Sequence, residues 1–354
     1  MNIAGAYGNC YNLTGSPVCG NKVTDMNRTY FNCYNLTGSP VCENNVKDMT
    51  NAYYYCTDLT GSPVCGNNVT NMVSTYFGCK NLTGSPVCGE NVRNMDYTYY
   101  GCTNLTGNPI LGERVYNMAG VYSGCCNLTG SPVCGRGEDM SYSYSGCTNL
   151  TGSPVCGRMI VNMAYAYHNC HNLTGSPVCE IYVTNMRGTY ANCSNLTGSP
   201  VCGGRVSNMS RAYYGCSNLT GSPICNNSVH NMDEAYTNCY NLSGAPACGS
   251  GVMKMYRTYA NCYNLCGNSY FYSRSVTDMM SCFYGRNTSN RLNLYVYANS
   301  KTFNTCTNMS TMAGATVITW TDDTATNGCY YNTIYNIYIY PVENVAAARA
   351  ANGD

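Results

Sequence analysis

Charged side chains are scarce in this chain. Its 354 residues include 18 Lys and Arg and 17 Asp and Glu, which gives a formal net charge of +1. Without a basic stripe to neutralise phosphates, nucleic acid is not an expected partner. No apolar run reaches the roughly 18 residues of a membrane span, so we expect no membrane insertion.

A secretory leader is also missing from the visible N-terminus. Residues 1–7 contain no basic segment followed by an apolar one, and they already match the end of the repeat described below. We therefore expect a chain that is made in the cytosol without a signal peptide, or one whose leader has been removed.

Familiar chemical sites are absent as well. No C-x-x-C occurs and no His recurs in register, so zinc is not expected and no other cofactor is indicated. His168 and His171 flank Cys170, which superficially resembles a nucleophile pair. Cys170 occupies a regular repeat position, however, so we expect no catalytic residue and no enzyme activity.

What the chain has instead is a 23-residue unit that recurs about eleven times. Its consensus is C-x-N-L-T-G-S-P-V-C-G-x-x-V-x-N-M-x-x-A/T-Y-x-G/N. A fixed period of this length indicates a solenoid, in which each unit buries its apolar face against its neighbours. The spacing of the first Cys is 23 residues throughout, except for 22 between Cys125 and Cys147.

Of the 27 Cys, 22 follow this repeat. Twelve occupy the first Cys slot and ten the second, in which Leu111 is the one exception. A slot that accepts Leu is buried and apolar, and free Cys acts there as a small hydrophobe. We therefore predict reduced Cys ladders in the core. A disulfide is most conceivable among the off-register residues Cys126, Cys266, Cys282, Cys306 and Cys329.

The first half of the unit at 33–55 predicts a short strand. Leu36, Val41 and Cys42 are expected to face inward, and the Leu-Thr-Gly-Ser segment has the length of a short strand. Pro40 cannot donate to a ladder, so this strand should end at or before it.

The second half predicts a short helix. Asn or Asp precedes the repeat Met, except at Lys254, and suits a helix N-cap. Gly or Asn precedes the next Cys, except at Tyr55, and tolerates the left-handed conformation that ends a helix. Between these positions Met49, Ala52 and Tyr53 share one helical face. Leu, Val, Cys, Met, Ala or Thr, and Tyr should point inward.

Most units also contain Asn-Leu-Thr, which matches an N-glycosylation acceptor. Without a signal peptide this match is discounted. We expect the Asn, replaced once by Asp58, to bond the backbone at the bend before the strand.

These spaced residues resemble the bacterial leucine-rich repeats of the BspA type, whose unit runs C-x-x-L…I-P-x-x-V-x-x-I-x-x-x-A-F-x-x-C. The resemblance covers roughly residues 1–280, and the segment 69–72 also resembles a surface repeat of mycoplasmas and other bacteria. This sequence departs from the family pattern in one respect: it has Gly-Ser-Pro where the family usually alternates aliphatic residues along the strand. The matching positions are Cys33, Leu36, Val41, Val46, Met49, Ala52, Tyr53 and Cys56.

The resemblance implies an α/β solenoid: a curved, right-handed leucine-rich-repeat-like coil with a short strand and a short helix in each unit. It also implies a role in binding, often on cell surfaces or in mobile elements, and it brings no catalytic residues.

The repeat pattern divides the chain into three parts. Residues 1–265 are predicted as the solenoid, 266–345 as degenerate repeats or a β-rich C-terminal cap, and 346–354 as a flexible tail or frayed helix. Strand-like runs lie at 292–297, 315–320 and 333–340. Residue 1 falls inside a unit, which leaves an open apolar face. We therefore expect residues 1–20 to contact another chain or an upstream domain.

Three surfaces could carry function. The Thr-Gly-Ser-Pro strip suits a periodic ligand such as a glycan or ice, although recent duplication also explains it. The pair after the repeat Gly and the residue after the first Cys vary freely, as exposed recognition sites or drifting positions do. An aromatic row follows the inward Tyr, either as a sugar or protein site or as a staple on the helix edge. The candidate residues are Phe31, Tyr54, Phe77 and Tyr100 in the row, with Tyr11, Tyr34 and Lys80 after the first Cys.

These observations predict a non-enzymatic binding or adhesion protein on a phage virion or a bacterial cell surface, which recognises a glycan or protein receptor. The first alternative is a structural subunit that stacks end to end into a fibre or decorates an assembly. An ice-binding lattice is a remote alternative.

Overall fold

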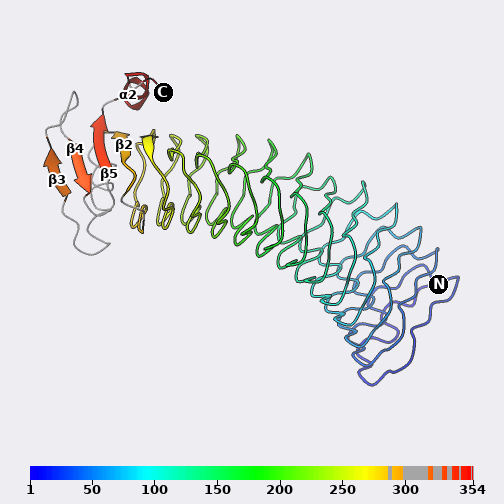
Figure 1. Cartoon of the computed structure of the whole chain (residues 1–354). Coiled ribbons are helices and arrows are strands. Elements are labelled where there is room, and N and C mark those ends of the chain that lie inside the picture. Colours follow the sequence, from blue (N-terminus) through cyan, green and yellow to red (C-terminus); the bar gives the residue numbers. More distant parts are fainter. Residues whose placement is uncertain are drawn as a thin grey trace. The chain divides into compact units, whose positions relative to one another are not determined.

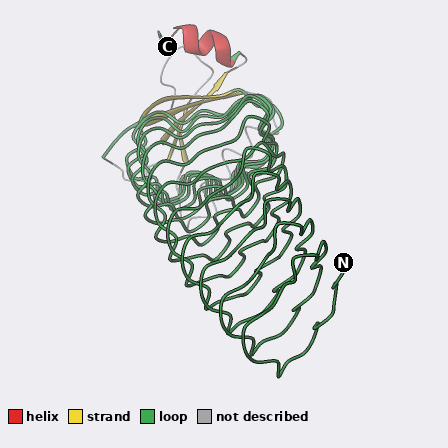
Figure 2. Cartoon of the chain, turned by 90° about the vertical axis from the view of Figure 1, so that its right-hand side faces the viewer, coloured by secondary structure: helices red, strands yellow, loops and turns green. Residues whose placement is uncertain are grey.

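Stacked coils of turns and irregular chain make up most of the protein (Figures 1 and 2). The computed structural model describes residues 1–285, 289–297, 318–321, 329–332, 337–342, 344–351 and 353. The chain divides into two units, Met1–Thr174 and Gly175–Asp354. The predicted repeat solenoid is confirmed within each unit. Its right-handed sense and curvature stay predictions of the resemblance.

The core of each coil is built from the predicted apolar columns. In the unit at 33–55, Leu36 is 1% exposed, while Val46, Met49 and Tyr53 are fully buried. The inward prediction for Val41 is wrong, because Val41 is only half-buried while Pro40 is buried. Successive residues of an extended segment point to opposite sides, so burying Pro40 turns Val41 outward. Cys42 is half-buried as well, but burial of its thiol raises its pKa, so its inward prediction holds in part.

The prediction of a short helix in each 23-residue repeat is wrong. Asn51, two residues after the repeat Met, has a φ of 54°, and the equivalent residues of the other coils also have positive φ. Alternate amides point out of the coil: Met49 N donates to Asn71 O at 2.9 Å and Tyr53 N to Thr75 O at 2.9 Å. A helix would need these amides for its own carbonyls four residues back, so the bonds between coils replace it with consecutive turns.

The residues expected to begin and end that helix still shape the turns. Asp48 Oδ1 accepts from Thr50 N at 2.8 Å, a bond that closes a turn instead of capping a helix. The predicted left-handed residue before the next Cys is confirmed, even at Tyr55, where φ is 56°. At Lys254, which has no acceptor oxygen, Asp233 Oδ1 from the previous coil accepts from Tyr256 N at 2.9 Å.

The predicted strand of the solenoid coils is wrong as well. In residues 1–266, parallel pairing is confined to isolated bridges, such as Asp25 with Asp48. Gly38 has a φ of 81°, which bends the Leu-Thr-Gly-Ser segment out of a strand. The segment keeps a bond to the neighbouring coil, from Thr60 N to Gly38 O at 2.9 Å.

A ladder of Tyr rings runs through the interior. Tyr53 and Tyr76 stack with centroids 5.5 Å apart and planes within 1°. The Tyr53 hydroxyl donates to Val41 O at 2.7 Å and accepts from Val41 N at 3.1 Å. From Tyr30 to Tyr213, each ladder Tyr therefore satisfies both backbone groups of a residue on the opposite wall of its own coil, where no ladder could do so. A Phe at this position would leave them without a partner. Tyr236 bonds only Ile224 O, and the Tyr259 hydroxyl has no partner among the described residues.

The first Cys of each coil lies beside this ladder as a hydrogen-bond donor. Cys56 Sγ donates to Tyr30 O at 3.0 Å, and Cys79 Sγ donates to Tyr53 O at 2.9 Å. Every Cys whose side chain the structure describes is a free thiol, including the off-register Cys126, Cys266 and Cys282. Cys306 and the Cys329 side chain lie outside the described residues.

The shorter coil after Cys125 lacks one loop residue and also lacks the buried Val or Ile of the other coils. Gly137 occupies that slot and is itself buried. A Cβ there would lie 1.7 Å from Tyr116 O, so the loop is drawn in against the previous coil and only Gly fits.

The second unit ends in a five-stranded sheet of order β1-β2-β5-β4-β3. Strands β1, β2 and β5 are parallel, while β4 pairs antiparallel with both β5 and β3. The helix α2 lies in the segment expected to be a tail or frayed helix. The bounds are β1 Gly267–Phe271, β2 Leu292–Tyr297, β3 Ile318–Thr321, β4 Cys329–Asn332, β5 Ile337–Val342 and α2 Val345–Ala351.

A second aromatic stack holds this sheet together. Tyr295 stacks on Tyr270 at 5.0 Å and on Tyr340 at 4.9 Å, and Val345 of α2 is buried against the same cluster. Strand β2 coincides with the predicted 292–297, whereas 315–317 and 333–336 of the other predicted strands lie outside the described residues. No helix of the described chain is long and apolar enough to cross a membrane.

We expect Tyr76→Phe to lower the free energy of unfolding by about 1–3 kcal/mol, because it leaves the partly buried Val64 N and O without their partner. Urea unfolding followed by circular dichroism measures the change. The control is Tyr34→Phe, since Tyr34 is exposed, and it should change the stability by less than about 0.5 kcal/mol. Equal effects of both substitutions would refute the role of the buried hydroxyl.

Stability should fall at alkaline pH. Burial raises the pKa of the Cys42 thiol to about 12 and that of Cys65 to about 11, from an ordinary value of 9.0. The folded protein therefore holds these protons more tightly than the unfolded chain. The resulting stability is fully present below about pH 9 and is lost as the pH rises towards 11–12. Urea midpoints measured between pH 7 and about pH 10 should decrease.

Replacing Cys65 and Cys88 by Leu, the residue found at 111, should flatten this decrease by removing two titrating groups. A midpoint that stays constant across this pH range would show that the buried thiols do not contribute.

Candidate functional site

Four rings that the sequence placed at equivalent positions form one stack in the first unit. We call Phe31, Tyr54, Phe77 and Tyr100 the aromatic row. Centroids are 4.8 Å apart from Phe31 to Tyr54 and from Tyr54 to Phe77, and 4.6 Å apart from Phe77 to Tyr100. The first three rings are half-buried, while Tyr100 is 39% exposed. The row is therefore a continuous, solvent-accessible ridge.

The faces of these rings are already occupied. The guanidinium of Arg28 lies 4.4 Å from the Phe31 centroid, and the Tyr97 ring contacts Tyr100 edge-on at 6.2 Å. Tyr55 contacts Tyr54 edge-on at 4.8 Å. The row therefore offers ring edges and Tyr hydroxyls to a partner, and no free face on which a sugar ring could stack.

Arg28, Tyr55 and Tyr97 were not predicted as part of this surface. All three have positive φ, at 53°, 56° and 55°. The left-handed backbone aims their side chains at the row. A usable signal was present at Tyr55, because a Tyr stands there where other units have Gly or Asn.

The other predicted site residues form a separate column. Tyr11 and Tyr34 stack with centroids 5.5 Å apart, and both are exposed. Lys80 is an exposed member of the same column, and half-buried Thr57 occupies the coil between Tyr34 and Lys80.

A second surface is polar, regular and almost free of charge. In the coils of the first unit, Asn, Thr and Ser of the Asn-Leu-Thr-Gly-Ser-Pro segment are exposed, while Pro is buried and Leu is buried in all but the first coil, where Leu13 is half-buried. We call these columns of the first unit the Asn-Thr-Ser face; Asp58 is its one charged member. It consists of Asn12, Asn35, Asp58, Asn81, Asn104, Asn127, Asn149 and Asn172; Thr14, Thr37, Thr60, Thr83, Thr106, Thr129, Thr151 and Thr174; and Ser16, Ser39, Ser62, Ser85, Asn108, Ser131 and Ser153.

The expectation that the Asn side chain bonds the bend is wrong for several of these coils. The bend closes by backbone bonds instead, such as Leu36 N to Cys33 O at 3.1 Å and Leu59 N to Cys56 O at 3.2 Å. Asn35 and Asn81 are exposed, and among the described residues their amides have no hydrogen-bond partner in the chain.

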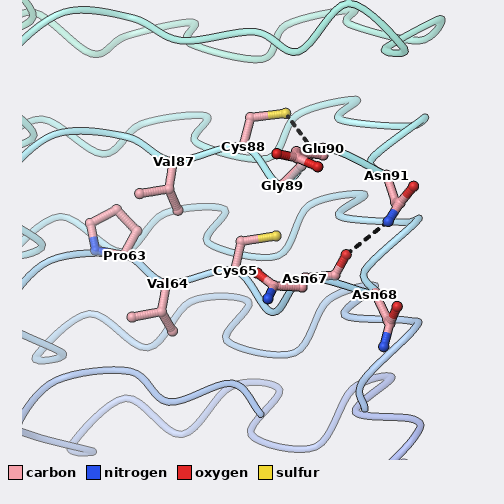
Figure 3. Close-up of a pocket in the computed structure, with 10 residues that line it drawn as sticks. All are labelled: Pro63, Val64, Cys65, Asn67, Asn68, Val87, Cys88, Gly89, Glu90 and Asn91. Atoms are coloured by element: carbon pink, nitrogen blue, oxygen red, sulfur yellow. Dashed lines mark hydrogen bonds between the residues drawn. The ribbon is translucent and has the colours of Figure 1, made fainter. Parts of the chain in front are cut away.

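A shallow pocket of about 610 Å³ lies between two coils of the first unit (Figure 3). The variable loops form one side of it, where Asn91 Nδ2 donates to Asn67 O at 3.0 Å. Cys65 and Cys88 line the pocket too, as half-buried thiols whose pKa values burial raises. Protonated thiols and amides give this pocket neither a nucleophile nor a charge cluster.

The Cys170 thiol has no catalytic geometry. It is fully buried, burial raises its pKa to about 12, and its Sγ donates to Tyr144 O at 3.0 Å. Burial also lowers the pKa of His168, whose Nδ1 lies 3.4 Å from Ser145 Oγ. Among the described residues no group of three or more His, Cys, Asp or Glu could hold a metal ion.

Comparisons with known proteins give little guidance. No protein-family model matches the sequence, and no curated protein does either. Among solved structures, the chain is similar to a leucine rich cell surface protein from Faecalibacterium prausnitzii A2-165. The identity is 18%, the match covers 72% of this chain and 77% of that chain, and the TM-score is 0.38.

Proposed function

We propose that this chain is a non-catalytic binding protein, displayed on a phage virion or a bacterial cell surface, whose aromatic row contacts a protein receptor. The observation that carries the proposal is the ridge of stacked, partly exposed rings at Phe31, Tyr54, Phe77 and Tyr100. The buried Cys170 thiol supports the absence of catalysis.

The residue types support a protein partner. Tyr, Phe and Arg are enriched where protein interfaces concentrate their binding energy. Rings that are already stacked and clamped by Arg28 lose little conformational freedom on binding. Because the ring faces are covered, a glycan would have to bind the row without stacking, which makes a protein surface the better fit.

The test uses fluorescently labelled full-length chain and a panel of bacterial strains. Treating the cells with protease should abolish binding, whereas periodate oxidation of their glycans should leave it intact. Tyr54→Ala with Phe77→Ala, and separately Tyr100→Ala, should weaken binding at least about tenfold, which corresponds to about 1.4 kcal/mol. Melting temperatures are measured in parallel.

The matched control is Tyr116→Ala, because Tyr116 is an exposed Tyr of the same unit outside the row, at 55% exposure. It should bind as the unchanged chain does. Loss of binding after periodate alone would replace the protein receptor by a glycan. If the variants have lower melting temperatures but bind normally, the row stabilises the fold and does not contact the receptor.

One observation favours the structural alternative of end-to-end stacking. In the first coil Tyr7 is 38% exposed, whereas its counterpart Tyr30 in the next coil is 2% exposed. We propose that a second copy of the chain, or an upstream domain, covers this face. Analytical ultracentrifugation separates the cases. Open-ended polymers favour the fibre, whereas a discrete small oligomer favours a receptor-binding protein whose chains pair at this face. A strict monomer at high concentration refutes self-association.

A further inference from the structure

The exposed columns of the first unit have not diverged equally. One column consists of the residue immediately before the Asp or Asn of each turn. Nearly every coil has a different residue there: Thr24, Lys47, Thr70, Arg93, Tyr116, Glu138 and Val161. The Thr column of the Asn-Thr-Ser face is Thr in all eight coils of the unit, and the Asn column changes only at Asp58. Recent duplication alone would have left both kinds of column alike. The constancy of this exposed face therefore needs a cause of its own.

Packing explains only part of that constancy. A Cβ on Gly61 would lie 2.2 Å from Ser39 Oγ of the previous coil, and its φ of 80° also favours Gly. Leu and Pro of the same segment are buried. The Asn amides and Thr hydroxyls are different, because they point to solvent. Thr60 Oγ1, for example, makes only a long contact of 3.4 Å with Gly38 O.

The geometry of the face suits a repeating ligand. One backbone bond per coil fixes its register, such as Thr83 N to Gly61 O and Thr106 N to Gly84 O, both at 2.9 Å. Successive rows therefore repeat at about the 4.8 Å spacing of neighbouring strands. A ligand meets side chains whose positions are already set, so little ordering opposes binding.

The chemistry of the face suits neutral sugars. Amides and hydroxyls both donate and accept hydrogen bonds, as sugar hydroxyls do, and Asp58 is the only charge. Val64 and Val87, which follow the Ser and Pro of their segments, are half-exposed and can meet the apolar face of a sugar ring. Aromatic and Arg side chains, which mark protein interfaces, are absent from these columns. Attached glycans on every Asn do not fit either, because a branched glycan is wider than the distance between coils.

We infer that the Asn-Thr-Ser face binds a neutral, insoluble polysaccharide, with successive sugars lying along successive coils. This site is distinct from the aromatic row, so either can fail without the other. Many weak, identical contacts then act together, and affinity depends on the number of intact coils.

The experiment is co-sedimentation of the full-length chain with microcrystalline cellulose and with chitin particles. The chain should bind at least one of these polymers. The variant Asn81→Ala, Thr83→Val, Asn104→Ala, Thr106→Val should bind it at least about tenfold more weakly, because contacts from two adjacent coils are lost. Its melting temperature should stay close to that of the unchanged chain, since these side chains are exposed and Thr106 Oγ1 makes only a long contact of 3.4 Å with Gly84 O.

The control variant, Lys47→Ala, Thr70→Ala, Arg93→Ala, changes exposed side chains of a variable column in the same unit and should bind as before. Failure to bind either polymer overturns the inference, as does equal weakening of both variants. A third outcome would assign the face to ice instead. In that case the unchanged chain inhibits ice recrystallisation, the variant at residues 81, 83, 104 and 106 does not, and neither polysaccharide is bound.

Discussion

The bond between the buried Tyr hydroxyl and the opposite wall of its coil, repeated from Tyr30 to Tyr236, is the constraint on which the rest of the solenoid depends. Tyr53 both donates to and accepts from the backbone of Val41, so one side chain closes the coil across its width. This tie holds the wall that carries Pro40 and the exposed Ser without a β-ladder. That wall is consequently free to present Asn, Thr and Ser in fixed register.

The sequence predicted the core better than the backbone. Periodic Leu, Met, Tyr and Cys identified the buried columns, because burial depends on the period and not on the kind of turn. The sequence did not show that the predicted helix would fail. The residue that interrupts it has positive φ, but this position holds residues as different as Arg28, Ser74 and Tyr97. Bonds between coils impose that conformation, and a single unit read alone cannot reveal them. Val41 was misplaced for a related reason: apolar character suggested the inside, but the buried Pro40 beside it decides the direction.

The two candidate surfaces differ in how far the sequence could define them. The aromatic row was visible as rings at equivalent positions of successive units. The contacts of Arg28, Tyr55 and Tyr97 with the row depend on backbone angles that no motif marks. The Asn-Thr-Ser face was visible as a constant strip. Its Asn column was expected to bond the backbone at the bend. The structure instead leaves the Asn35 and Asn81 amides exposed and without that bond, which makes the face a candidate binding surface.

The 22-residue coil shows where this architecture tolerates change. A whole residue is missing, yet the buried Tyr144 keeps its place in the ladder and the loop at Gly137 absorbs the difference. Most coils close on themselves and bond their neighbours in the same way, so gaining or losing one by unequal recombination leaves the remaining contacts intact. The length of the array is then a heritable quantity that can vary between close relatives, and with it the reach of the protein and the number of contacts it offers.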